Sequence, residues 1–128
     1  MTDHADLTRR LADLVVGYGA NVQPGQIVGI TTYTGKEALT REVARASYER
    51  GARWVDVVTF DPWVKRERLA HADESTLEYI PPWLEERLEW LSAEHAARVT
   101  LNGPSAPDSL DGIDPARAGR DVLPYLPK

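Results

Sequence analysis

The sequence predicts an α/β fold in which a small parallel sheet is flanked by helices in a three-layer arrangement. Short runs rich in apolar and β-branched residues alternate with longer segments of helical periodicity. This alternation is typical of parallel sheets, because each connection between parallel strands must cross over the sheet. The strand candidates are 27–32, 54–59 and 97–102. So small a sheet is incomplete, and we expect an extra strand from another part of the polypeptide or from a partner.

The first helix is expected from about Asp6 to Tyr18. Apolar residues recur along it at intervals of three and four, as on a helix with one buried stripe. The stripe consists of Leu7, Leu11, Leu14, Val15 and Tyr18.

A second helix is predicted between the first two strands. Thr34 and Glu37 have the spacing of a capping box, which places the start of the helix at Thr34. Gly51 suits the position just after the helix, where a positive φ is favoured. The expected buried stripe is Leu39, Val43 and Ala46. Strand, helix and strand then form a βαβ unit.

Prolines mark the starts of the later helices. Pro62 opens one that is expected to reach about Ala72, and Pro82 opens another. The buried stripe of the latter is predicted to be Leu84, Leu88 and Leu91. Asp114 and the proline after it predict the N-cap and first position of a short helix.

Composition excludes several classes of function. The chain has 128 residues, a net charge of −5 and no cysteine, so disulfides, thiolate metal sites and cysteine nucleophiles are excluded. The acidic balance argues against nucleic acid and anionic membranes as partners. No apolar run approaches the roughly 20 residues of a transmembrane helix. The first residues lack a secretory signal, so we expect a cytoplasmic protein.

The titratable residues do not form a recognisable hydrolytic motif. The histidines are His4, His71 and His95. They have no zinc-binding spacing, so we interpret them as exposed. The carboxylate pairs at 73–74 and 85–86 are interpreted as solvated surface, because neighbours on a helix do not face each other. We therefore assign neither catalytic nor metal-binding residues.

The segment 29–37 resembles a phosphate-binding loop only superficially. Its glycines are one residue too far apart, and Glu37 stands where the loop needs serine or threonine. A capped helix start is the better interpretation, and a weak anion site at that helix end is the alternative.

The sequence also contains candidate surfaces. Its tryptophans are Trp54, Trp63, Trp83 and Trp90. Trp54 is expected in the core or on a face of the sheet. Core packing is the first interpretation of the other three, and a docking surface formed by one or two of them is the alternative. Ligands of open parallel sheets lie beyond the carboxyl ends of the strands. Thr32, Asp61 and Asn102 lie at these ends and are the candidates for lining a cleft, although loop and capping roles explain the same residues.

Four stretches in the same order resemble the start of the thermophilic-type metalloaminopeptidases, the M29 or aminopeptidase T family. They are YGANVQPGQIV (18–28), ASYERGAR (46–53), LEYIPPWLEER (77–87) and GIDPARAGRD (112–121). The resemblance covers essentially the whole chain. It implies that residues 1–122 are an amino-terminal α/β domain and that 123–128 begin an inter-domain linker.

The resemblance also implies a function for the parent protein. Members of the family remove N-terminal residues from peptides, are usually dimeric and use two divalent ions such as cobalt, zinc or manganese. Their metal ligands lie in a carboxy-terminal domain, which is expected to be absent from this chain. We therefore expect the chain to be non-catalytic on its own and to bind no metal. The alternatives are a stand-alone small-ligand-binding module of flavodoxin-like or Rossmann-like type, and a dimerisation module.

Overall fold

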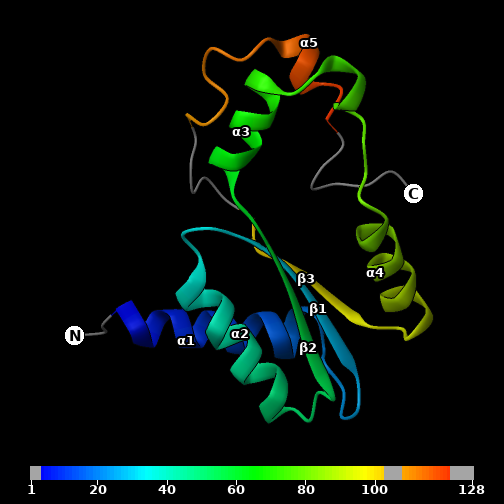
Figure 1. Ribbon diagram of the computed structural model, residues 1–128. Helices are drawn as coiled ribbons and strands as arrows, with labels where there is room; N and C mark the ends of the chain where they lie inside the picture. Colours follow the sequence, from blue (N-terminus) through cyan, green and yellow to red (C-terminus); the bar gives the residue numbers. More distant parts are fainter. Residues whose placement is uncertain (1–3, 103–107, 122–128) are drawn as a thin grey trace.

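The computed structural model, which describes residues 4–102 and 108–121, has a parallel sheet at its centre (Figure 1). The strands are β1 (Ile27–Tyr33), β2 (Trp54–Phe60) and β3 (Ala97–Thr100). They lie in the order β2-β1-β3, so the first strand in the sequence is the central one. The predicted α/β fold is confirmed, and each predicted strand lies within two residues of the observed one.

The register brings the carboxyl ends of the strands to one edge. β1 pairs with β2 from Ile27 opposite Trp54 to Tyr33 opposite Phe60. Its other side pairs with β3 over residues 28–31. Within residues 4–102 and 108–121, no strand pairs with the outer side of β3.

One face of the sheet is covered by α1 (His4–Leu14), the π-helical turn η1 (Val15–Gly19) and α2 (Glu37–Glu49). The main core lies between these helices and the sheet. It is made of small and branched apolar side chains. They pack closely, and their removal from water stabilises the fold. Its buried members are Ala12, Val16, Val22, Val28, Ile30, Val43, Ala46, Ala52, Val55, Ala97, Val99 and Leu101.

The predicted buried face of the first helix is wrong. Ala12 and Val16 are fully buried, whereas most of the predicted stripe faces outward. Its exposed members are Leu7, Leu11, Leu14 and Tyr18. The periodicity correctly identified an apolar face, but a second face carries the small residues that allow α1 to pack close to α2 and the sheet.

The predicted capping box of α2 is also wrong. α2 begins at Glu37, and its N-cap Lys36 makes no side-chain capping bond. The Glu37 carboxylate instead accepts the backbone N–H of Gly35, at 2.9 and 2.7 Å from its two oxygens. Gly35 has a φ of 94°, which places a turn between Thr34 and the helix. The end of α2 is as predicted, because Gly51 follows it with a φ of 92°.

The opposite face of the sheet is covered by α4 (Pro82–Ala93). Leu84 and Leu91 are buried and Leu88 is partly buried, which confirms the predicted stripe. Leu91 packs against Gly29 in the central strand: a Cβ at residue 29 would lie 2.8 Å from Leu91 Cδ1. The glycine therefore allows α4 to approach the sheet.

A group of short helices lies beyond the carboxyl edge of the sheet (Figure 1). It comprises α3 (Pro62–His71), the 3-10 turn η2 (Glu74–Thr76) and α5 (Pro115–Ala118). Arg117 of α5 donates to the carbonyls of Leu69 and Ala72, at 2.7 and 2.5 Å. As predicted, Asp114 caps α5 through the N–H of Ala116.

The tryptophans are not core residues. Their exposed fractions lie between 38% and 54%, and they are Trp54, Trp63, Trp83 and Trp90. The core-packing interpretation is therefore wrong, whereas the alternative expectation for Trp54, a place on the sheet, agrees with its position as the first residue of β2. In the described part of the chain, no helix combines the length and apolar character needed to cross a membrane.

Candidate functional site

The carboxyl edge of the sheet is the candidate site. Tyr33 and Phe60 end paired strands in register, and the N–H of Leu101 donates to the carbonyl of Thr31 at 2.9 Å. The predicted cleft residues all lie beside these positions. Their side chains, however, have different surroundings.

Thr32 points into the helix layer. It is 2% exposed, and its Oγ1 lies 2.9 Å from Oγ1 of Thr40 on α2. Thr40 in turn donates to the carbonyl of Lys36 at 2.8 Å, so the Thr32 hydroxyl donates to Thr40. This chain of hydrogen bonds ties β1 to the first turn of α2.

Asp61 is the N-cap of α3. Its Oδ1 accepts the backbone N–H of Trp63 at 2.9 Å and that of Val64 at 3.4 Å. A carboxylate at this position accepts hydrogen bonds from backbone N–H groups that have no partner within the helix. Its negative charge also interacts favourably with the positive end of the helix dipole. Pro62 occupies the first helical position, where its missing N–H costs nothing.

Asn102 lies two residues beyond the end of β3 and is exposed, and it makes an interaction with the rest of the molecule. The fold therefore brings the three strand ends to one edge. It turns Thr32 towards α2 and Asp61 towards the first turn of α3, so these two side chains do not converge on a common point. A role in lining a cleft remains a prediction for all three.

The structure adds an aromatic pair that the sequence interpretation missed. The rings of Tyr33 and Phe60 have centroids 6.3 Å apart and an interplanar angle of 41°, and this separation lies within the range of about 4.5–7 Å for interacting aromatic pairs. The two residues are the last of their strands. The predicted strands end at residues 32 and 59, one residue short of this pair. The sequence of each strand also does not show which residues of the two strands face each other.

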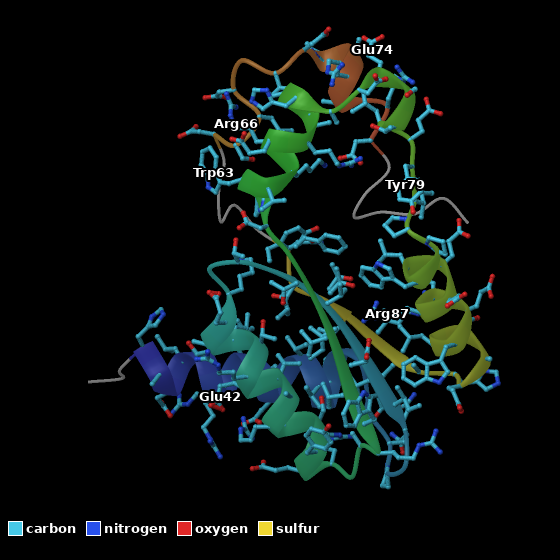
Figure 2. All side chains as sticks on the ribbon, viewed as in Figure 1. Glu42, Trp63, Arg66, Glu74, Tyr79 and Arg87 are labelled. Atoms are coloured by element: carbon cyan, nitrogen blue, oxygen red, sulfur yellow. The ribbon has the colours of Figure 1, made fainter. Side chains whose placement is uncertain are left out.

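Arg87 of α4 reaches across to the sheet (Figure 2). Its Nε lies 2.5 Å from Oδ2 of Asp56 on β2, and its Nη2 lies 3.4 Å from the carbonyl oxygen of Ile30 on β1. The Arg87 side chain is 11% exposed. A guanidinium held in this way acts as a clamp between helix and sheet.

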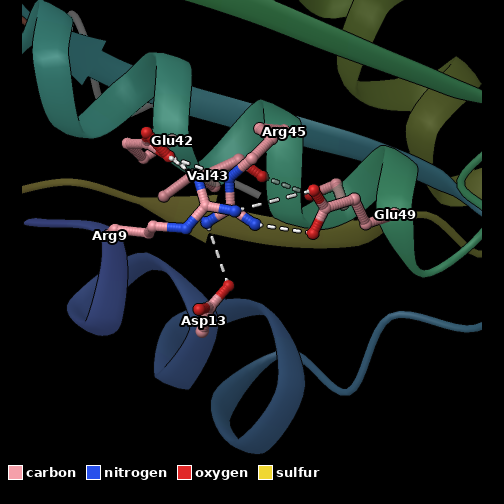
Figure 3. A network of polar contacts seen from close by, with 7 residues as sticks. Arg9, Asp13, Glu42, Val43, Arg45 and Glu49 are labelled. Carbon is pink, nitrogen blue, oxygen red and sulfur yellow. Dashed lines mark hydrogen bonds and ion pairs between the residues drawn. The ribbon is translucent and has the colours of Figure 1, made fainter. Parts of the chain in front are cut away.

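The densest charge cluster joins α1 and α2 (Figure 3). Arg45 donates to Glu42, Glu49 and Asp13, at 2.8, 2.7 and 3.0 Å. The bond to Glu42, followed by those to Asp13 and Glu49, raises the pKa of Arg45 above its ordinary value. Arg9 adds pairs to Glu42 and Glu49. Because arginine occupies the space between the carboxylates, this cluster is suited to joining two helices rather than to binding a cation.

The described residues do not fit a catalytic metal. No group of three or more histidine, aspartate or glutamate side chains within 4–102 and 108–121 is placed to hold an ion. The histidines are exposed, as predicted: His4, His71 and His95. A hydrolytic zinc site needs at least three clustered protein ligands, so we assign no metal chemistry to these residues.

Comparisons with known proteins give a consistent result. Residues 4–122 match the family model described as thermophilic metalloprotease (M29). Aminopeptidase T of Thermus aquaticus is 34% identical over 111 residues, and aminopeptidase PepS of Streptococcus thermophilus is 32% identical over 108 residues. A solved structure of wild-type AmpT from Thermus thermophilus matches with a TM-score of 0.81 and 33% identity.

These matches cover most of this chain but a minor part of each relative. The two aligned regions are 87% and 84% of this chain, and 27% and 26% of the respective relatives. For the solved structure, the shares are 90% of this chain and 30% of the other. The chain therefore spans about a quarter to a third of the proteins that it matches.

Proposed function

Because this chain belongs to the M29 family of thermophilic metalloproteases, we propose that it is the amino-terminal α/β domain of a metal-dependent aminopeptidase. The parent enzyme would remove N-terminal residues from peptides in the cytoplasm. The observation that carries this proposal is the family match over residues 4–122. In the separate alignment with aminopeptidase T of Thermus aquaticus, the 111 aligned residues are only 27% of that protein.

We propose that the chain does not hydrolyse peptides by itself. Metal-dependent peptide hydrolysis needs an ion that activates water and polarises the scissile carbonyl. The described part of the chain has no group of residues placed to hold such an ion. The two divalent ions, cobalt, zinc or manganese, would be held by a carboxy-terminal domain. Residues 1–122 would then form the domain and 123–128 would begin the linker to that second domain.

The domain would contribute structure to the enzyme. Its strand ends and the helices above them would help to wall the cavity in which a peptide is held, and its exposed apolar residues would contribute to assembly. Tyr79 and the exposed tryptophans of α3 and α4, Trp63, Trp83 and Trp90, support this role, because aromatic residues are enriched at the cores of interfaces. We propose that the parent enzyme is a homo-oligomer.

The test compares this chain with the full-length protein encoded by its gene. Both are dialysed against chelator, supplied with cobalt, zinc or manganese, and assayed for release of amino acids from a set of short peptides. We expect metal-dependent release from the full-length protein and none from residues 1–128. Metal-stimulated release by the short chain would refute its non-catalytic role. A full-length protein inactive with every metal would refute the aminopeptidase assignment.

A further inference from the structure

The outer face of α1 carries an apolar stripe that nothing in the described structure covers. Leu7, Leu11 and Leu14 are 53%, 48% and 62% exposed, and Tyr18 in the following π-helical turn is 91% exposed. The spacing of four, three and four residues repeats the d and a positions of a coiled-coil seam. Single exposed apolar residues are ordinary, whereas a continuous row of four is typical of a contact surface.

The stripe faces away from the neighbouring helix. Arg9 and Asp13 form the ion pairs with α2, and they lie about 150° around the helix from the leucines at 3.6 residues per turn. Ala12 and Val16 face the core. One side of α1 is thus fixed to α2 and a second is packed in the core, and no residue of 4–102 or 108–121 covers the third side.

The sheet of the described residues also has edges with room for further strands. α2 contacts β1 and β2, while the core-facing residues of β3 share their cluster with Ala12 and Val16 of α1. Within the described residues, the outer edge of β3 has no partner strand. The described residues therefore leave both the outer face of α1 and the edge of the sheet available to a further part of the polypeptide.

We infer that the stripe of Leu7, Leu11, Leu14 and Tyr18 is the seat of an amphipathic helix from the polypeptide that follows residue 128 in the full-length protein. This inference rests on the proposed function, which makes the chain one part of a longer polypeptide. The relatives support a longer polypeptide, because the region aligned with this chain is only 27% of the length of aminopeptidase T.

A second copy of this chain fits the stripe less well than a helix of the same polypeptide. A stable dimer usually buries about 20–30 residues a side, and the stripe offers four. A helix from the same polypeptide does not need so large an interface, because covalent connection raises its effective concentration to the order of millimolar. The size of the stripe therefore favours a tethered partner.

The experiment places charges on the stripe in both lengths of the protein. Leu11→Glu/Leu14→Glu is made in residues 1–128 and in the full-length protein, with Leu11→Met/Leu14→Met as the matched control. Glutamate and methionine have similar helix propensities, so the two variants differ in polarity. Thermal unfolding is followed by circular dichroism, and mass is measured by analytical ultracentrifugation.

In the full-length protein, we expect the glutamate variant to lower the unfolding midpoint by about 5 °C or more, and the methionine variant to change it by less than about 2 °C. In residues 1–128, where the stripe is exposed, both variants should stay within about 2 °C of the unmodified chain. If the short chain gives no clear transition, the inference is tested by the difference in unfolding midpoint between the glutamate and methionine variants of the full-length protein.

Several outcomes would overturn the inference. One is an equal change in the unfolding midpoint of the glutamate and methionine variants of the full-length protein. A second is an equal fall in the midpoint of the glutamate variant in residues 1–128 and in the full-length protein. A third is a gene that ends at the codon for Lys128. A short chain that dimerises, and that the glutamate variant converts to monomer, would instead assign the stripe to a second copy. Peptide hydrolysis by the unmodified full-length protein is measured in parallel. A glutamate-specific loss of stability in an inactive protein would refute the proposed function and leave the docking surface standing.

Discussion

Arg87 on α4 and Asp56 on β2 form an ion pair with Nε and Oδ2 2.5 Å apart, and it links the two layers on one face of the sheet. The arginine side chain is 11% exposed and the aspartate side chain 28%. Arg87 also reaches the carbonyl of Ile30, so a single side chain contacts two strands. The guanidinium is largely removed from water. Loss of the Asp56 carboxylate would therefore leave a nearly buried positive charge without its counter-charge, which destabilises the folded state.

Replacing the carboxylate should therefore destabilise the fold. We expect Asp56→Ala to lower the free energy of unfolding by about 2–3 kcal/mol, because it leaves a largely buried cation without its counter-charge. Asp56→Asn keeps an acceptor and should cost less. Urea unfolding at neutral pH, followed by tryptophan fluorescence and by circular dichroism, measures both.

An exposed ion pair provides the matched control. Arg53 and Glu94 lie 3.4 Å apart, with side chains 59% and 42% exposed. Glu94→Ala should change the free energy of unfolding by less than about 0.5 kcal/mol, because water screens such a pair. If Glu94→Ala cost as much as Asp56→Ala, burial would not be the source of the effect.

Gly29 should be intolerant of a methyl group. A Cβ at this residue would lie 2.8 and 3.1 Å from the two Cδ atoms of Leu91, so Gly29→Ala is expected to cost about 1–3 kcal/mol of stability through overpacking. The measurement is a double-mutant cycle with Leu91→Ala. The double variant should lose less stability than the sum of the single losses, because each change offsets the other.

Gly19 provides the contrast. A Cβ there would meet Leu14 O at 3.9 Å, an ordinary contact distance. Gly19→Ala should be neutral or stabilise the chain by up to about 1 kcal/mol, because it reduces the freedom of the unfolded state. Additive losses in the cycle at 29 and 91 would contradict the packing explanation.

Local sequence signals predicted most of the fold. β-branched runs mark the strands because such side chains suit a pleated, buried surface. Pro62, Pro82 and Gly51 mark helix ends because their backbone preferences act within one turn. Tertiary packing decided what the local signals could not. Periodicity assigned the leucines of α1 to the core, whereas close approach to α2 selected Ala12 instead.

The candidate site was less predictable for the same reason. The strand ends could be located, and the parallel sheet brings them to one edge. The direction of each side chain depends on partners distant in the sequence. Thr32 meets Thr40 and Tyr33 meets Phe60, and neither contact follows from the composition of one strand.

Substitution of Asp61 tests whether this residue, at the end of β2, stabilises the chain by capping α3. Asp61→Ala should cost about 1 kcal/mol of stability, because the N–H groups of Trp63 and Val64 lose their acceptor. Asp61→Ser can accept the same hydrogen bonds and should recover most of the loss. Thermal and urea unfolding of both variants make the comparison. If serine were as destabilising as alanine, capping would not explain the residue.

Asp73 gives a prediction for pH dependence. Its Oδ1 accepts the backbone N–H of Ser75 at 2.9 Å and the Ser75 hydroxyl at 2.8 Å, and these bonds, the backbone one first, lower the pKa of Asp73. The charged form is thus favoured in the folded state. Its contribution to stability is fully present above the unfolded-state pKa and is lost as the pH falls through the lower folded-state pKa.

Carbon-detected NMR titration of the Asp73 carboxyl between neutral and strongly acidic pH measures this directly. Ser75→Ala should raise the pKa of Asp73 part of the way towards its ordinary value, because it removes the hydroxyl bond and keeps the backbone bond. Thr76→Ala is the control, since the Thr76 hydroxyl donates to the backbone carbonyl of Asp73 at 2.7 Å and not to its carboxylate. The explanation requires the two variants to differ: an unchanged titration in Ser75→Ala, or an equal shift in both, would show that the hydroxyl does not hold the proton affinity down.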